Sequence, residues 1–319
     1  SAPVSYISRT DAGALIPQEY AEAIIKETPQ ASAIMSLARR LPDMSAKQKN
    51  LPVASALVTA AFVNATYSDD ADTGQKPTSE AIWANKSIIA EELAVIVPIP
   101  ESVLEDADYD IWGEVKPQIV EAFGQAFDAA VLYGTNAPAT WPNSILAGAT
   151  AAGHTVKIGT GADLYEDIMG EAGTLALVEA DGYLVTGHVG ALTMKSKLRG
   201  LRDANGVPIF NSSVQEKTRY ILDGSDCVFP LNGAINPASS LLVSGDWSKL
   251  VYSIRKDVTY KVLTEAVIQN AAGNILYNLA QQDMVALRAV MRLGWQLPNP
   301  VNRINAVEGS RYPFAVLIP

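Results

Sequence analysis

The chain has 319 residues, a formal net charge of −10 at pH 7 and a sequence pI near 4.8. Its length allows one large domain or two closely packed ones, and its acidic balance opposes autonomous nucleic-acid binding, which needs a clustered cationic surface. Hydrophobic residues make up 48% and charged residues 18% of the chain, a composition that suits a protein covering much of its surface with copies of itself.

Cysteine and hydropathy patterns exclude several further classes of protein. Cys227 is the single cysteine, so an internal disulfide and a cysteine zinc site are both ruled out. The sequence has no apolar run of about 18 residues, so we expect no membrane span. It has no signal-peptide pattern, so we expect no secretion. We therefore expect a protein made in a reducing cytoplasm. Ser1 stands in place of Met, as expected from initiator-Met removal or from cleavage of a longer propeptide.

The first 49 residues read as an N-terminal tether. A polar, Ser-rich start is followed by two short segments with apolar residues at helical spacing, 17–27 and 30–40, and Pro42 ends the second. We expect small helices on an arm and not an independent domain.

The run from residue 50 to residue 100 reads as a long β ribbon. Its arms, 51–66 and 80–98, are rich in Val, Ile, Ala and Thr, and residues 67–79 between them are a cluster of turn and solvating residues. An isolated two-stranded ribbon is marginally stable in water, so arms of this length need a surface to lie on. The pattern indicates a neighbouring subunit wherever the rest of this subunit does not supply that surface.

A long helix is expected next, over residues 111–132. Apolar residues recur at helical spacing and predict one face turned to a core, namely Val115, Ile119, Ala122, Phe123, Ala126 and Ala130. The acidic stretch 101–110 before it suits the start of a helix. Pro117 marks either the first turn or a kink, and the sequence leaves both open.

Short elements separated by glycines follow from about residue 147. We expect one helix over 159–180 capped near Asp163, a strand over 181–188, a turn at Asn205 and Gly206, and short strands at 227–229 and 240–244. The last third is rich in strands, and alternation over 283–297 predicts one long strand with a charged face. Together these segments indicate an α+β protein.

Residues able to carry out catalysis are scarce. We interpret His154 as an exposed loop residue and place His188 at the end of a strand, and neither has metal-ligand spacing. No GxSxG motif is present, and the glycines at 159–161 lack the rest of a phosphate-binding motif. Carboxylates crowd residues 101–110 without the spacing of a calcium loop. We therefore predict no catalytic residue, no cofactor and no metal.

Two alternative classes stay open at this point. A cytoplasmic α+β hydrolase with a dispersed triad would need a serine, one of the two histidines and a carboxylate to converge in one pocket. A surface-array protein or adhesin would need secretion, which the missing signal and disulfides oppose.

Three stretches, in order, resemble the major capsid proteins of tailed bacteriophages, which have the Hong Kong 97 capsid fold. They are AEELAVIVPIPESVLEDADYDIW with its helix EVKPQIVEAFGQAFDAAVLYGTN at 90–136, GDWSKLVYSIRKDVTYKVLTEA at 245–266, and QQDMVALRAVMRLGWQLPNP at 281–300. The likeness covers most of the chain, although residues 147–240 match in their general pattern of short elements more than in their individual residues.

The resemblance implies a division of the chain into four parts. These are an N-terminal arm at 1–49, an extended β-hairpin loop at 50–95, a peripheral domain with a long spine helix at 96–145 and 251–304, and an axial domain at 146–250 and 305–319. It also implies inter-subunit contacts along the extended loop, for which we single out Val53, Leu57, Phe62, Lys76, Ile82, Trp83 and Ile88.

The same resemblance implies the partners. The chain would assemble with itself as pentamers and hexamers into an icosahedral virion shell that encloses double-stranded DNA without sequence-specific binding, with no membrane involved. Scaffold and portal proteins, and a decoration protein, are further expected partners, and assembly is expected in the host cytoplasm. Some relatives crosslink a lysine of the extended loop, where Lys76 lies here. Encapsulin nanocompartments share the fold and stay an alternative.

Overall fold

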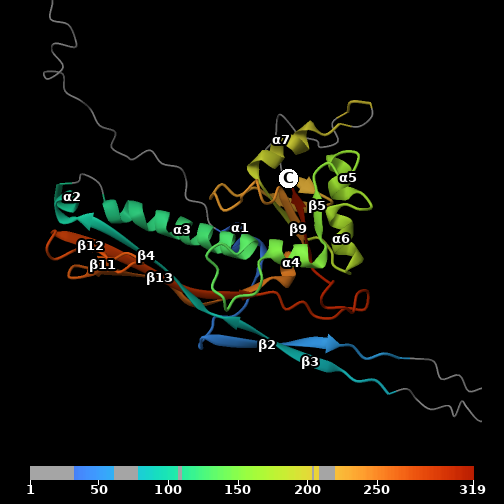
Figure 1. The fold of residues 1–319 in the computed structure, drawn as a ribbon, viewed down its shortest axis with the longest axis horizontal. Coiled ribbons are helices and arrows are strands. Elements are labelled where there is room, and N and C mark those ends of the chain that lie inside the picture. Colours follow the sequence, from blue (N-terminus) through green and yellow to red (C-terminus); the bar gives the residue numbers. More distant parts are fainter. Residues whose placement is uncertain (1–31, 61–77, 107–109, 203–204, 208–219) are drawn as a thin grey trace, which may run out of the picture.

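Two β-sheets and a projecting hairpin organise the chain (Figure 1). The structure is a computed structural model and describes residues 32–60, 78–106, 110–202, 205–207 and 220–319. The helix predicted over 17–27 lies outside these ranges.

The first sheet has four strands in the order β1-β10-β13-β4. Its strands are β1 (Arg39–Arg40), β10 (Val251–Leu263), β13 (Met284–Gln296) and β4 (Glu91–Pro100). The long central strand β13 is antiparallel to both β10 and β4. This confirms the long strand that alternation predicted, with the arginines at 288 and 292 on one face and buried apolar residues on the other.

The long helix α3 (Ile111–Tyr133) lies over one face of this sheet (Figure 1), which confirms the predicted spine-like helix. Asp110 caps its start by accepting a hydrogen bond from the Gly113 amide. Gly134 ends it with φ of +74°, a left-handed conformation that glycine adopts without steric cost. Because the helix begins at Ile111, Pro117 lies in its second turn and not in its first.

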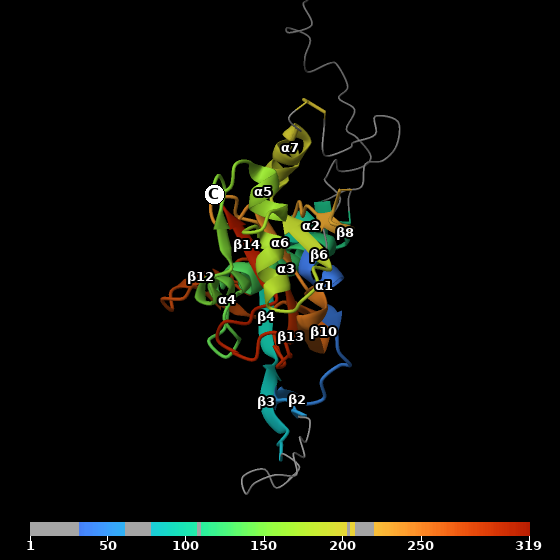
Figure 2. The same ribbon diagram turned by 90° about the vertical axis from the view of Figure 1, so that its right-hand side faces the viewer.

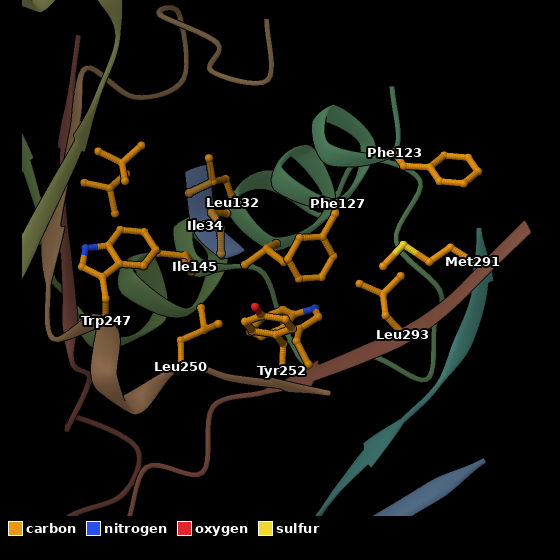
Figure 3. Packing of buried hydrophobic residues seen from close by; sticks show 14 of the residues in the cluster. Ile34, Phe123, Phe127, Leu132, Ile145, Trp247, Leu250, Tyr252, Met291 and Leu293 are labelled. Atoms are coloured by element: carbon orange, nitrogen blue, oxygen red, sulfur yellow. The ribbon is translucent and has the colours of Figure 1, made fainter. Parts of the chain in front are cut away.

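The main core fills the space between α3 and the four-stranded sheet (Figure 3). Phe123 and Phe127 from α3 meet Met291 and Leu293 from β13, and Tyr252 from β10 packs beside them. The predicted helical stripe therefore faces this core, and of its members only Ala122 is exposed.

The second sheet has six strands in the order β5-β14-β9-β6-β8-β7. These are β5 (Thr155–Lys157), β14 (Phe314–Ile318), β9 (Leu242–Gly245), β6 (Gly187–Gly190), β8 (Ser225–Val228) and β7 (Ile221–Leu222). Four helices surround this sheet (Figures 1 and 2), namely α4 (Ile145–Ala152), α5 (Leu164–Met169), α6 (Thr174–Ala180) and α7 (Leu192–Gly200).

Smaller elements complete the described part of the chain. Two hairpins are formed by β2 (Gln48–Ala56) with β3 (Ile82–Ile89) and by β11 (Val267–Gln269) with β12 (Ile275–Asn278). The remaining helices are short, namely α1 (Ala33–Leu37), α2 (Glu101–Asp106) and the 3₁₀ helix η2 (Trp247–Lys249).

Five predictions of local structure are wrong. The strand expected over 181–188 forms only at its end, where β6 begins at Gly187. The second ribbon arm expected over 80–98 is two strands, because β3 pairs with β2 whereas β4 pairs with β13 in the four-stranded sheet. The helix expected over 159–180 is two helices, because Gly170 and Gly173 pass so close to the end of α5 that an added Cβ would lie within 2.8 Å of a backbone carbonyl. The helix expected over 30–40 stops at Leu37, and the two residues of β1 pair with β10 instead. His154, expected to be exposed, is 5% exposed because Asp181 and the Phe314 carbonyl bind its ring.

Candidate assembly interface

The hairpin β2–β3 projects away from both sheets (Figures 1 and 2). Its strands are antiparallel, with Leu51 opposite Lys86 and Val53 opposite Ala84. The pairing continues past the strands, since the Thr59 amide donates to the Ser79 hydroxyl at 2.8 Å. The two sides of the hairpin are therefore still paired near the point where the described residues end, at Ala60 and Thr78.

The base of the hairpin is fixed by its own subunit. Ile88 is 0% exposed and lies in a small core with Met44, Ala90 and Val251. Val53 is 7% exposed. Both were predicted to be inter-subunit contacts, and in the isolated subunit their side chains have little surface left to offer a neighbour.

A segment near the C-terminus, residues 297–311, holds the hairpin from one side; we call it the strap. The strap amide of Val301 donates to the Ala54 carbonyl at 3.0 Å, and Arg303 donates to the Val58 carbonyl at 2.9 Å. Lys86 of β3 forms an ion pair with Glu308 of the strap at 2.8 Å, which lowers the pKa of the Glu308 carboxyl. These three contacts therefore join the small core around Ile88 in setting the direction in which the hairpin leaves the body.

The strap is in turn anchored beside the six-stranded sheet. The Asp181 carboxylate, 6% exposed, accepts hydrogen bonds from the Tyr312 amide and the Asn305 amide group, both at 2.7 Å, and lies 3.1 Å from Nε2 of His154. Arg311, 2% exposed, donates to the carbonyls of Asn299 and Asn305. Polar contacts thus run from the six-stranded sheet through the strap to the hairpin.

The outer part of the hairpin exposes apolar side chains on both of its faces. Ile82 is 53% exposed and Trp83 is 69% exposed, and adjacent residues of a strand point to opposite faces. Leu57 is half-buried. The predicted contact residues Phe62 and Lys76 lie outside the described residues. Of the predicted set, Ile82 and Trp83 therefore offer the most free apolar surface among the residues the structure places.

A second buried carboxylate joins the N-terminal part of the described chain to the long helix. Asp128 of α3 accepts hydrogen bonds from the Ser32 hydroxyl at 2.5 Å, from the Ala33 amide at 3.0 Å and from the Asn232 side chain at 2.9 Å. Burial raises the pKa of the Asp128 carboxyl despite these donors. The start of α1 is thereby fixed to α3 and to the 230–236 loop.

The histidines do not form a catalytic site. His188 pairs with Ser244, with 2.8 Å between Nδ1 and Oγ, and His154 pairs with Asp181, but the two pairs are separate and no member is more than 6% exposed. Substrate has no access to either pair. The backbone amides of the glycine loop at 159–161 are hydrogen-bonded within the subunit. Gly159 and Gly161 both donate to the Asp167 carboxylate at 2.7 Å, as expected for a helix-capping loop.

A cavity of about 400 Å³ lies between α3, β4 and the 134–141 loop. Its lining is mostly apolar, with Phe127, Trp141 and Leu293 prominent, and it includes no histidine, cysteine or serine. Among the described residues, no group of three His, Cys, Asp or Glu side chains is placed to hold a metal ion. The same part of the chain contains no helix with the length and apolarity needed to span a bilayer.

Comparisons with known proteins decide the family. The sequence profile of the phage capsid family matches residues 12–306. The chain belongs to the phage capsid family. It is 29% identical over 280 residues to the major capsid protein of Staphylococcus phage 80alpha, an alignment that covers 86% of this chain and 79% of that one.

Solved structures agree with this assignment over the whole length of the chain. A chain from Microbacterium phage Oxtober96 is 38% identical with a TM-score of 0.85, covering 99% of this chain and 100% of that one. A chain from Mycobacterium phage Adephagia is 30% identical with a TM-score of 0.83, covering 99% and 98%. The capsid of a native GTA particle, at 15% identity and a TM-score of 0.67 with 99% of both chains covered, shares the fold.

The predicted Hong Kong 97-type α+β capsid fold and the capsid function are confirmed by these findings. The chain is a major capsid protein of the tailed-phage type, a structural protein of the virion that assembles with itself into a shell, and the hydrolase alternative is wrong.

Sequence reasoning missed the strap and its two anchors. Its residues 297–311 carry no periodicity, and the side chains of Asn302 and Asn305 accept hydrogen bonds from backbone amides two residues further on. The signal in the sequence is the regular spacing of Asn299, Asn302 and Asn305 beside Arg311, because asparagine side chains support turns by bonding nearby backbone amides. Asp128 offered another signal, as a carboxylate on the apolar face of a long helix.

Proposed function

We propose that this chain forms pentamers and hexamers of an icosahedral shell enclosing double-stranded DNA, and that β2–β3 lies across the adjacent subunit in each ring. The four-stranded sheet with α3 is then the peripheral domain, and the six-stranded sheet is the axial domain. The observation that carries the proposal is Trp83, which is 69% exposed on the outer part of the hairpin. Exposed apolar surface of this kind marks a site of protein association.

The energetics of such a shell favour many small contacts. Burial of an apolar side chain contributes about 1.5–3 kcal/mol, so covering Ile82 and Trp83 on every hairpin stabilises each junction modestly and the closed particle strongly. The acidic balance of the chain, at −10, suits a container for DNA, since a lining of like charge leaves the packaged polymer free to move. Scaffold, portal and decoration proteins are expected partners, and assembly in the host cytoplasm is the expected location.

Deleting residues 67–79 tests the arm. The isolated variant should keep the circular dichroism spectrum and urea unfolding curve of the parent, because the contacts that fix the hairpin to the body come from residues 51–58 and 86–90, which the deletion leaves intact. It should form no closed particles by negative-stain electron microscopy. The matched control replaces 67–79 by a Gly/Ser sequence of equal length, which keeps the length of the segment and removes its native side chains. Normal shells from the deletion variant would refute the proposal.

A further inference from the structure

The cavity between α3, β4 and the 134–141 loop has large apolar side chains on three of its walls. Phe127 points from α3 toward the sheet, and Leu293 points from β13 toward the helix (Figure 3). Trp141 of the loop stands edge-on to Phe127, with 6.1 Å between the ring centroids and 80° between the ring planes. An apolar cavity of about 150 Å³ is large enough to bind benzene. The 400 Å³ found here therefore accommodate an aromatic ring with a short chain attached.

Small residues line the rest of the cavity. They are Ala122, Ala126, Ala129 and Ala130 on α3 and Gly233 and Ala234 on the 230–236 loop. The loop passes close to the helix, because a Cβ on Gly233 would lie 3.1 Å from Nε2 of Gln125. The space between the walls thus follows from the small size of the side chains on them.

Hydrogen bonds fix the walls in position. Nε1 of Trp141 donates to the Ile89 carbonyl at 3.1 Å. The Asn232 side chain donates to Asp128 at 2.9 Å and accepts from the Ala234 amide at 3.1 Å. A site with walls that are ordered beforehand loses little conformational entropy when a ligand binds.

One carboxylate is placed among these apolar residues. Glu91 of β4 lies opposite Leu293 in the strand register and so shares the sheet face that is turned to α3. Its side chain is 22% exposed. The Thr140 hydroxyl donates to Oε1 of Glu91 at 2.9 Å. The other oxygen, Oε2, has no hydrogen-bond partner in the part of the chain that the structure describes.

The nearest cation to Glu91 does not belong to the cavity. Nζ of Lys47 lies 3.5 Å from Oε1, but the Lys47 side chain is 62% exposed and is not part of the lining. Exposed ion pairs of this kind contribute little. The adjacent Glu92 differs, because Nε and Nη2 of Arg292 both donate to it, at 2.9 Å and 2.6 Å. Glu91 is therefore the carboxylate that can bind a cation inside the cavity.

We propose that this cavity binds a small organic ammonium compound, with its charged nitrogen at Oε2 of Glu91 and its apolar body among Phe127, Trp141 and Leu293. The aromatic rings favour a cation in the site, because the face of an aromatic ring carries negative charge density. An anionic ligand would be repelled by the carboxylate. The site lies within one subunit, so the inference does not depend on the proposed pentamers and hexamers.

Two probes with the same apolar body test the charge requirement. Phenylbutylamine is protonated at pH 7, whereas phenylbutanol is neutral. Ligand-observed NMR titration of isolated full-length subunits should show at least tenfold tighter binding of the amine, which corresponds to ~1.4 kcal/mol. Glu91→Gln should weaken amine binding by about tenfold and leave alcohol binding unchanged. Glu92→Gln is the matched control and should keep the preference for the amine.

A second pair of variants tests whether the cavity is the place of binding. Ala126→Leu fills part of the space and should abolish binding of both probes. Val120→Leu also enlarges a side chain on α3, at a position that is 46% exposed and does not line the cavity, and should bind as the parent does. Urea unfolding curves of the two variants show whether either has lost its fold.

Three outcomes would overturn the inference. They are equal affinity of the parent for the two probes, an unchanged preference for the amine in Glu91→Gln, and unchanged binding in a folded Ala126→Leu. Assembled shells should bind the amine as isolated subunits do. Binding by subunits that is lost in shells would assign the cavity to a neighbouring subunit and would also overturn the inference. Electron microscopy scores shell formation separately, so a failure of ligand binding leaves the proposed function standing.

Discussion

His188 shows how burial sets the charge state of one side chain in this subunit. It is 0% exposed in β6, with its ring between the Ser244 hydroxyl and the Leu222 carbonyl. Burial lowers the pKa of His188 to about 4, from an ordinary value of 6.5. The imidazole is therefore neutral at neutral pH and behaves as a polar core residue.

The stability of the isolated subunit should consequently fall as the solution is acidified. Between pH 6.5 and the folded-state pKa of about 4, the unfolded chain binds a proton at residue 188 that the folded chain does not, so the free energy of unfolding decreases as pH drops. Each pH unit in that window contributes about 1.4 kcal/mol. Urea unfolding at pH 7 and pH 5 should differ by about 2 kcal/mol from this residue.

The variant His188→Gln isolates the effect of that proton. Gln keeps a donor and an acceptor near Leu222 and Ser244 but does not titrate, so its stability at pH 7 is lower and its dependence on pH shallower. The difference between the parent and the variant should shrink on acidification. An equal slope for both proteins between pH 7 and pH 5 would show that His188 titrates normally.

At the scale of elements, one glycine lets the hairpin pass over the sheet. A Cβ on Gly294 of β13 would lie 2.3 Å from the Ile89 carbonyl oxygen and 2.8 Å from Cγ2 of Ile88. The same carbonyl accepts a hydrogen bond from Nε1 of Trp141 at 3.1 Å. The backbone of the hairpin therefore rests on β13 where a side chain is absent.

Gly294→Ala should separate the end of β3 from β13. Overpacking of this kind costs about 1–3 kcal/mol, and we expect a loss in that range from urea unfolding together with fewer closed shells. Gly200→Ala is the matched control, because no atom lies within 4 Å of the Cβ that it would add at the end of α7. Equal unfolding curves for the two variants would contradict the close approach.

How much of this architecture can be predicted from the sequence depends on how far apart in the chain the interacting residues lie. The helix α3 and the strand β13 follow from periodicity, because burial of one face repeats along the element itself. The burial of His154 was missed because its partners, Asp181 and Phe314, are distant in the chain. The strap was missed for the same reason, since Asp181, which anchors it, lies more than a hundred residues away in the chain.

At the scale of the whole molecule, the hairpin is the part whose environment must change most on assembly. Trp83 is 69% exposed in the single subunit, whereas Trp247 and Trp295 are each 1% exposed and Trp112 and Trp141 are half-buried. The fold of the single subunit therefore already buries four tryptophan side chains fully or in part. The fifth is the one that a neighbouring subunit is expected to cover.

Tryptophan fluorescence should therefore report assembly through residue 83. When isolated subunits are converted to shells, emission should shift to shorter wavelength and become less accessible to iodide, because an indole leaving water enters an apolar environment. Trp83→Phe keeps an aromatic ring in the hairpin, should still permit particles, and should remove most of the shift. If Trp83→Phe shells show the same shift as the parent, then other tryptophans change environment and residue 83 stays in water. Any contact between the hairpin and its neighbour would then be made by the opposite face, which carries Ile82.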